Sequence, residues 1–70
     1  MENGSERYEV RWADTMKPAS ENAFSNEQRA RDTALAKSDI DQSEGRAVMV
    51  VKVKPDSTLR VATYRNGHEI

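Results

Sequence analysis

Apolar and polar residues alternate strictly near the start of this chain. From Arg7 to Trp12, the side chains of Tyr8, Val10 and Trp12 fall on one side, and Glu9 and Arg11 fall on the other. A period of two that is rich in aromatic and β-branched residues is typical of a half-buried β-strand. The pattern therefore predicts a strand over these six residues.

The C-terminal half predicts a β-hairpin, because two further alternating segments flank a turn. The segments run from Arg46 to Lys54 and from Thr58 to Arg65, with Pro55-Asp56-Ser57 between them. Proline is suited to the first central position of such a turn. Asn66-Gly67 favours another tight turn, after which the chain either folds back as a short strand or frays.

A helix is predicted between the first strand and the hairpin. Ser25 and Gln28 stand in the spacing of a capping box, and good helix formers follow as far as about Ser38. Ala30 and Ala34 share one face of this helix. The polar, turn-rich residues 13–24 predict a loop.

Together these elements predict an α+β fold of order β-α-β-β. We expect a three-stranded, mostly antiparallel sheet with one helix packed on one face, and a right-handed crossover if the first two strands are adjacent. Residues 1–6 predict a disordered leader, and residues 7–70 a single domain. The expected core consists of Tyr8, Val10, Trp12, Ala30, Ala34, Leu35, Met49, Val51, Val53, Leu59 and Val61.

Length and composition leave little room for a large core. The chain has 70 residues and no cysteine, so no disulfide can stabilise the fold. A chain this short buries only about 60% of the surface exposed by its unfolded form, so self-association into a homodimer is a natural route to stability. No apolar run approaches the roughly 20 residues that span a membrane. We therefore expect a cytoplasmic protein without a membrane partner.

Charge is sorted along the chain, although the net charge is only −1. Residues 46–65 carry five cations and one acid, whereas residues 19–45 carry six acids and three cations. Segregation of this kind indicates one basic and one acidic surface if the two segments form different faces.

One helix covers one face of a sheet, so the expected fold leaves the other face open. If Met49 and Val51 face the helix, the open face combines an apolar patch with cations. The residues predicted to bind a partner there are Val48, Val50, Tyr64, Arg11, Lys52, Lys54 and Arg60. Such a face suits a protein interface or a homodimer seam. A nucleic-acid surface is less favoured because one tyrosine is a small stacking platform, and an ordinary solvated face is the remaining alternative.

Catalysis, cofactors and metals find little support in the sequence. Asp39-x-Asp41-x-Ser43 resembles the start of a calcium loop, but Glu44 and Val50 occupy the positions that need glycine and glutamate. His68 is the only histidine, and a zinc site needs three or four ligands. No glycine-rich phosphate loop is present. We expect no enzyme activity, no metal and no cofactor.

The sequence thus favours a small non-catalytic binding or accessory protein that acts through a protein contact or self-association on the open sheet face. One alternative is a nucleic-acid-binding protein that uses the same cations. Another is an inhibitor or mimic that presents acidic residues to a basic partner. The acids of that alternative are Asp32, Asp39, Asp41 and Glu44. Trp12 is expected in the core rather than as a binding anchor, because the core is short of bulk.

Overall fold

The computed structural model describes residues 7–70, apart from the side chains of residues 21, 22 and 42. The predicted leader, residues 1–6, lies outside the described residues. Along the chain the elements are β1 (Arg7–Trp12), β2 (Pro18–Phe24), α1 (Glu27–Lys37), α2 (Ile40–Ser43), β3 (Val48–Val53), β4 (Thr58–Arg65) and β5 (His68–Glu69).

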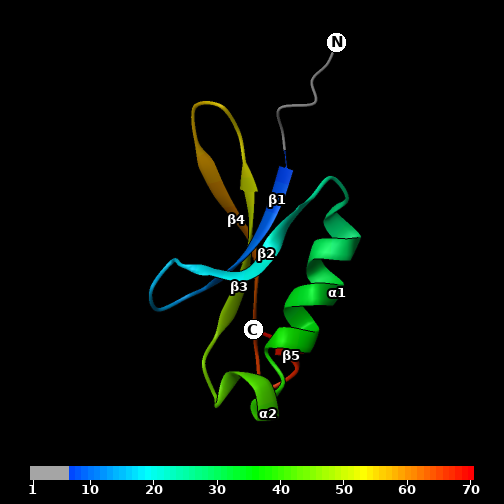
Figure 1. Ribbon diagram of the computed structural model, residues 1–70, viewed down its shortest axis with the longest axis vertical. Coiled ribbons are helices and arrows are strands. Elements are labelled where there is room, and N and C mark those ends of the chain that lie inside the picture. The colour runs from blue at the N-terminus through cyan, green and yellow to red at the C-terminus, as the bar shows by residue number, and fades with distance from the viewer. Residues whose placement is uncertain (1–6) are drawn as a thin grey trace.

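The strands form one five-stranded sheet in the order β2-β1-β3-β4-β5, and every neighbouring pair is antiparallel. The expected number of three strands is wrong, because β2 and β5 extend the sheet at its two margins. Helix α1 lies against one side of this sheet, and the short α2 lies at the end opposite the β3–β4 turn (Figure 1). The α+β class is confirmed, and so are β1, α1 and the β3–β4 hairpin. The expected crossover between β1 and β3 is wrong, because β2 reverses the chain and makes these neighbours antiparallel.

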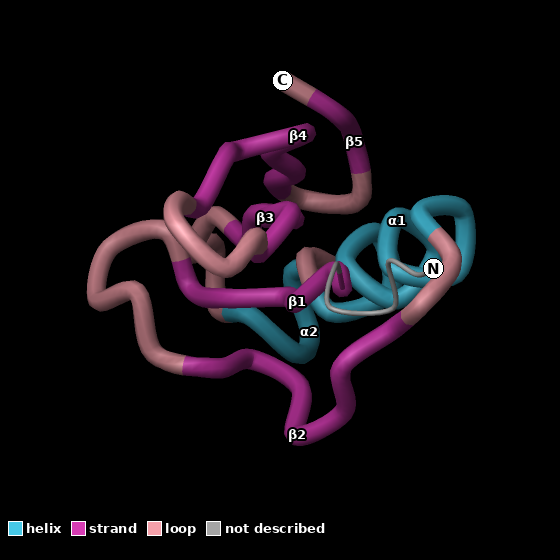
Figure 2. Tube along the Cα trace, turned by 90° about the horizontal axis from the view of Figure 1, so that it is seen from above, coloured by secondary structure: helices cyan, strands magenta, loops and turns pink. Residues whose placement is uncertain are grey.

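Strand β2 occupies part of the segment predicted as a loop. It pairs with β1 through Tyr8↔Phe24 and Glu9↔Ala23, and the register then shifts before Arg11↔Pro18. Viewed from above, β2 forms one margin of the sheet (Figure 2). Ala19 and Phe24 of β2 pack against the core cluster, but they are five residues apart and the register shift between them interrupts the period-two alternation. That is why the sequence pattern did not reveal it.

Helix α1 begins one residue later than the capping box predicts. Its N-cap is Asn26, whose side chain accepts hydrogen bonds from the backbone N–H groups of Gln28 and Arg29. The helix ends at its C-cap Ser38, as expected. Ala30 and Ala34 are fully buried against the sheet, because small side chains let the helix backbone approach the strands closely.

The face of the sheet that α1 covers is the opposite of the one predicted. Val10, Val48 and Val50 are completely buried, and Ala62 and Tyr64 nearly so, in one cluster with Ala30 and Ala34. The pairing explains this arrangement, since Val10 is opposite Val50 and Trp12 is opposite Val48. Side chains of directly paired residues share a face. The predicted side is therefore right for the residues of β1 and wrong for those of β3.

A bulge in β4 contributed to this error. Val50 pairs with Ala62 and Val51 with Arg60, so Val61 is an extra residue on the β4 side. An extra residue reverses the alternation beyond it. As a result Thr58, Arg60 and Thr63 fall on one face despite the odd spacing between Arg60 and Thr63. Leu59, which the alternation placed in the core, is 50% exposed.

Strand β5 confirms that the chain folds back after Asn66-Gly67. Both residues have positive φ angles, 53° and 79°, as a type I′ turn requires. Arg65 pairs with His68, and Tyr64 with Glu69. The turn rests on the end of α1, where the Gly67 backbone N–H donates to Ser38 Oγ over 3.1 Å.

Candidate functional site

The side of the sheet turned away from α1 is called the open face here. Cross-strand pairing places on it every second residue of β1 and β3, together with the β4 residues that the bulge brings to the same side. These residues are Arg7, Glu9, Arg11, Met49, Val51, Val53, Thr58, Arg60 and Thr63. The apolar side chains come from the central strand β3, and the charged and polar ones come from its two neighbours.

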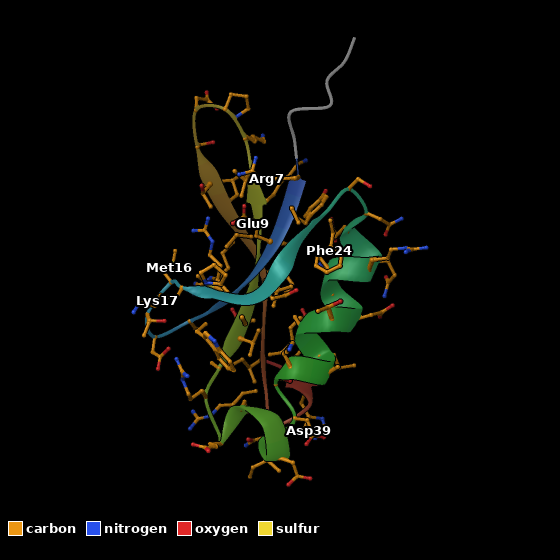
Figure 3. The ribbon with its side chains drawn as sticks, in the orientation of Figure 1. Arg7, Glu9, Met16, Lys17, Phe24 and Asp39 are labelled. Atoms are coloured by element: carbon orange, nitrogen blue, oxygen red, sulfur yellow. The ribbon has the colours of Figure 1, made fainter. Side chains whose placement is uncertain are left out.

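Met49 and Val51 are 4% and 2% exposed, although no helix lies over them. Longer side chains from adjacent strands and from the β1–β2 loop shield them. Together with Met16, Thr58 and Arg60 they line a hollow of about 360 Å³. Met16 itself is 49% exposed, and it lies on the side of the sheet away from α1 (Figure 3). The hollow therefore has an apolar floor, a flexible methionine on one margin and an arginine on another.

A chain of ion pairs runs along β1 on the open face. Arg7 Nε donates to Glu9 Oε2 over 2.9 Å, and Arg11 donates to Glu9 Oε1 over 2.7 Å from Nη2 and 3.0 Å from Nε. The hydrogen bond from Arg11 is the main reason that the pKa of Glu9 lies below its ordinary value, and Arg7 lowers it further. Glu9 is thus held as a carboxylate between two cations, and the three residues together carry one net positive charge.

Arg60 lies two strands away from Glu9, in the row Glu9–Val51–Arg60. Its side chain is exposed, and it forms no ion pair with any of the described side chains. An exposed guanidinium next to an apolar hollow can form hydrogen bonds to a carboxylate in a bidentate manner. Arg60 therefore gives the open face a solvent-exposed cationic donor that a partner could engage.

The predicted binding residues are divided between several places. Arg11 and Arg60 lie on the open face, as predicted. Val48, Val50 and Tyr64 do not, because α1 and the sheet bury them. Lys52 faces the α1 side next to Tyr8, with its Nζ 5.9 Å from the ring centre, and Lys54 lies at the β3–β4 turn. The patch expected from the sequence is therefore replaced by Met16, Met49, Val51 and Thr58.

The sequence pattern does not single out Met16, because this residue lies in a loop. It favours Met49 and Val51 as core residues under the helix, because they alternate with Val48 and Val50. One signal could have corrected the assignment. In β4, Arg60 and Arg65 are five residues apart, and two arginines can share the solvent side at an odd spacing only if a bulge lies between them.

Trp12 packs against the core cluster and is partly buried. The Arg46 guanidinium lies 4.2 Å from the centre of its ring and donates two hydrogen bonds to Asp14, at 2.9 and 3.1 Å. The hydrogen bond from Arg46 lowers the pKa of Asp14. This cluster joins the β1–β2 loop to the segment before β3, so Trp12 and Arg46 have a structural role.

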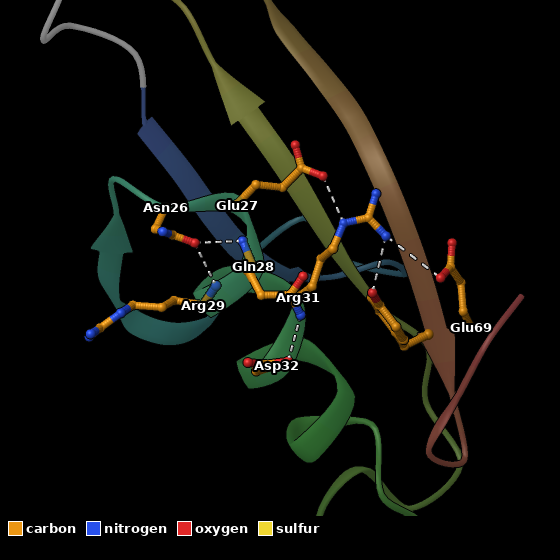
Figure 4. A network of polar contacts seen from close by, with 8 residues as sticks. Asn26, Glu27, Gln28, Arg29, Arg31, Asp32 and Glu69 are labelled. Carbon is orange, nitrogen blue, oxygen red and sulfur yellow. Dashed lines mark hydrogen bonds and ion pairs between the residues drawn. The ribbon is translucent and has the colours of Figure 1, made fainter.

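The acids of the mimic hypothesis are all exposed, but two of them already form local hydrogen bonds. Asp39 Oδ1 accepts from the Asp41 backbone N–H over 2.9 Å at the start of α2. Asp32 accepts from the Gln28 side chain over 2.9 Å, one turn away on α1. Figure 4 shows this contact beside the bonds of Arg31, which pairs with Glu27 and reaches Glu69 at 3.6 Å.

Among the side chains that the structure describes in residues 7–70, no three of histidine, cysteine, aspartate or glutamate lie close enough together to hold a metal ion. In the same part of the chain, no helix is long and apolar enough to cross a membrane. Comparison with protein-family models, curated proteins and solved structures finds no match for this chain.

Proposed function

We propose that this protein is a small non-catalytic binding domain whose open face contacts a protein partner. The observation that carries the proposal is the apolar hollow formed by Met16, Met49 and Val51, with Arg60 at its margin. Protein interfaces are enriched in methionine and arginine, and a buried apolar centre surrounded by polar groups is their usual composition. Methionine is also flexible enough to adapt to a partner's side chain.

The charge of the open face favours an acidic partner. Glu9 is already shared by Arg7 and Arg11, so the ion-pair chain and Arg60 together leave two positive charges. A partner carboxylate that approaches Arg60 can gain a bidentate hydrogen bond, which offsets part of the cost of leaving water. An acidic residue next to an apolar one on the partner would fill both parts of the site.

The nucleic-acid alternative has less support than the protein-binding one. It depended on Tyr64 as an exposed stacking platform, and Tyr64 is 5% exposed beneath α1. The cations of the open face are also partly neutralised by Glu9. Protein recognition is therefore the function that the arrangement of apolar and charged groups favours.

A capture experiment tests the proposal. The wild type and three variants, Met16→Asp, Arg60→Glu and Arg29→Glu, are used as bait with chemical cross-linking in extract of the source cell. Arg29 is exposed on α1, so Arg29→Glu makes the same charge change as Arg60→Glu away from the open face. Met16 has a φ of 65°, a conformation that aspartate tolerates better than most residues.

We expect the wild type and Arg29→Glu to retain one common protein, cross-linked through the open face, and the other two variants to lose it. Equal capture by all four baits would contradict the proposal. Light scattering across a concentration series covers the self-association version. In that version a dimer of the wild type dissociates in Met16→Asp and Arg60→Glu, and persists in Arg29→Glu.

A further inference from the structure

Among the residues that the structure describes, no strand pairs with most of the outer edge of β4. β4 pairs with β3 from Thr58 to Tyr64, but β5 pairs only with Tyr64 and Arg65, and one more hydrogen bond joins the Ile70 N–H to the Thr63 carbonyl. Within the described part of the chain, residues 58–62 therefore have a neighbouring strand, β3, on one side alone. In an antiparallel strand the backbone N–H and C=O groups point alternately to the two sides. Part of this stretch consequently presents unpaired backbone groups outward.

A hollow of about 390 Å³ lies where β5 ends and the edge of β4 continues. Its lining comes from Arg60, Val61, Ala62 and Thr63 of β4 and from Glu69 and Ile70. A strand that continued the line of β5 along β4 would pass through this hollow. The shape and the unpaired backbone groups thus suit the same occupant, an extended peptide.

The side chains along this edge specify the occupant's composition. On the open face the edge carries Arg60, an exposed cation without a described ion-pair partner. On the other side it carries Leu59, which is 50% exposed, and at the end of the hollow lies Ile70, which is 71% exposed. Residues opposite one another on neighbouring strands interact favourably when their charges are opposite or both are apolar.

We propose that the free edge of β4 accepts, as a sixth strand, an extended segment of a partner protein in which acidic and apolar residues alternate. The proposal rests on the proposed function and names the form in which the partner is bound. The acidic side chains face Arg60, and the apolar ones face Leu59. Backbone hydrogen bonds supply most of the affinity in this mode of recognition, and the alternating side chains supply the selectivity.

A second copy of this chain fits the edge less well. Antiparallel pairing of two β4 edges brings the Arg60 side chains of the two copies onto the same face at close range. Like charges in neighbouring cross-strand positions are destabilising. The other margin of the sheet, β2, is also a weaker docking edge, because it begins with Pro18, which lacks a backbone donor, and its register is irregular.

The test uses a synthetic peptide of about eight residues that alternates glutamate with valine, with blocked ends. It is titrated into uniformly ¹⁵N-labelled full-length protein, and amide shifts and hydrogen exchange are followed by NMR. We expect shifts in β4 from Thr58 to Ala62 and at Ile70, with slower exchange of the amides that point outward, and no comparable change in β2. A peptide with lysine in place of glutamate, and the variant Arg60→Glu, should each weaken binding at least about tenfold, whereas Arg29→Glu should not.

Backbone pairing is tested separately with two N-methylated peptides. One is methylated at the backbone nitrogen of every glutamate and the other at that of every valine, so that in each peptide the methyl groups lie on one side of the strand. Only the peptide whose methylated nitrogens face β4 should lose binding, because methylation there removes the hydrogen-bond donors and leaves the side chains intact. Equal binding of both methylated peptides, shifts located in β2, or no binding of the parent peptide would overturn the proposal. So would β4 shifts that appear with protein concentration alone, since the edge would then be occupied by a second copy. If the peptide fails while Met16→Asp still loses the captured partner, the proposed function stands without this inference.

Discussion

At the scale of single residues, two buried serines connect the helices to the sheet. Ser38 Oγ lies 2.8 Å from the Leu35 carbonyl, to which it donates, and it accepts from the Gly67 N–H. Ser43 Oγ lies 3.0 Å from the carbonyl oxygens of Ser38 and Asp39. Both serines are almost completely buried, and buried polar groups are stable only when such partners are present. These two hydroxyls therefore fix the end of α1 against α2 and the β4–β5 turn.

We expect Ser38→Ala to lower the free energy of unfolding by about 1–3 kcal/mol, because the Gly67 N–H loses its acceptor at a partly buried position. Urea unfolding followed by circular dichroism measures the effect. Ser25→Ala, at an exposed position, serves as the control and should change little. Equal effects of the two substitutions would show that the hydroxyl of Ser38 has no special role.

Glu9 provides a second prediction at this scale, through pH. The pKa of Glu9 in the folded protein is below its ordinary value of 4.5, chiefly because of Arg11. Its stabilising contribution is therefore complete above the unfolded-state pKa and is lost as pH falls through the folded-state pKa. In denaturant titrations between about pH 6 and pH 2, the stability advantage of the wild type over Glu9→Gln should shrink as the pH falls below 4.5. A constant difference across this range would contradict the prediction.

At the scale of elements, the stability of α1 depends on its N-cap and on packing against the sheet more than on a broad apolar face of its own. Only Ala30 and Ala34 are buried among its residues, so the helix contributes a small apolar area to the core. Its first turn is held by the Asn26 side chain, and Glu27 pairs with Arg31 one turn later over 2.8 Å (Figure 4). The start of the helix is consequently set by side-chain hydrogen bonds rather than by burial.

Two substitutions distinguish Asn26, the N-cap in the structure, from Ser25, the N-cap that the sequence pattern favours. We expect Asn26→Ala to cost about 1 kcal/mol, because it removes the acceptor of two backbone N–H groups. Ser25→Ala should cost a few tenths of a kcal/mol or less, since Ser25 precedes the cap. Chemical denaturation of both variants measures the difference, and a larger effect at Ser25 would support the capping box.

At the scale of the whole molecule, the question is which face of the sheet α1 covers. Val48 and Val50 are fully buried beneath it, whereas Met49 and Val51 are shielded on the open face by neighbouring side chains. A sheet with one covering helix is stable only if the second apolar face is small or shielded. The long side chains around Met49 and Val51 meet this requirement while leaving a hollow accessible to a partner.

Aspartate substitutions at two apolar strand positions should therefore have very different effects on folding. We expect Val50→Asp to unfold the domain, because it buries an unpaired carboxylate and removes core volume, at a cost above about 4 kcal/mol. Leu59→Asp should leave the domain folded and change its stability by less than about 1 kcal/mol, because Leu59 is half exposed. Circular dichroism and one-dimensional NMR distinguish the two outcomes. A folded Val50→Asp variant would favour the face assignment made from the sequence.

The sequence by itself determined the elements whose side chains carry a local signal. Alternation located β1, β3 and β4, helix propensity located α1, and Asn66-Gly67 located the final turn, so the α+β class followed. Of the candidate site, it placed Arg11 and Arg60 on the open face. These features depend on neighbours within a few residues, which a sequence displays directly.

Only the tertiary structure decided the remaining features, because each depends on a neighbour distant in sequence. β3 is apolar on both sides around Val48–Val51, so its own pattern could not show which side meets the helix. The pairing of Val10 with Val50 settled the choice, and the bulge at Val61 concealed the matching pattern in β4. β2 pairs with β1 in an irregular register and packs only partly buried side chains such as Phe24 against the core, so its own pattern did not reveal it. The open face is thus built from side chains whose positions follow from strand register, which long-range pairing fixes.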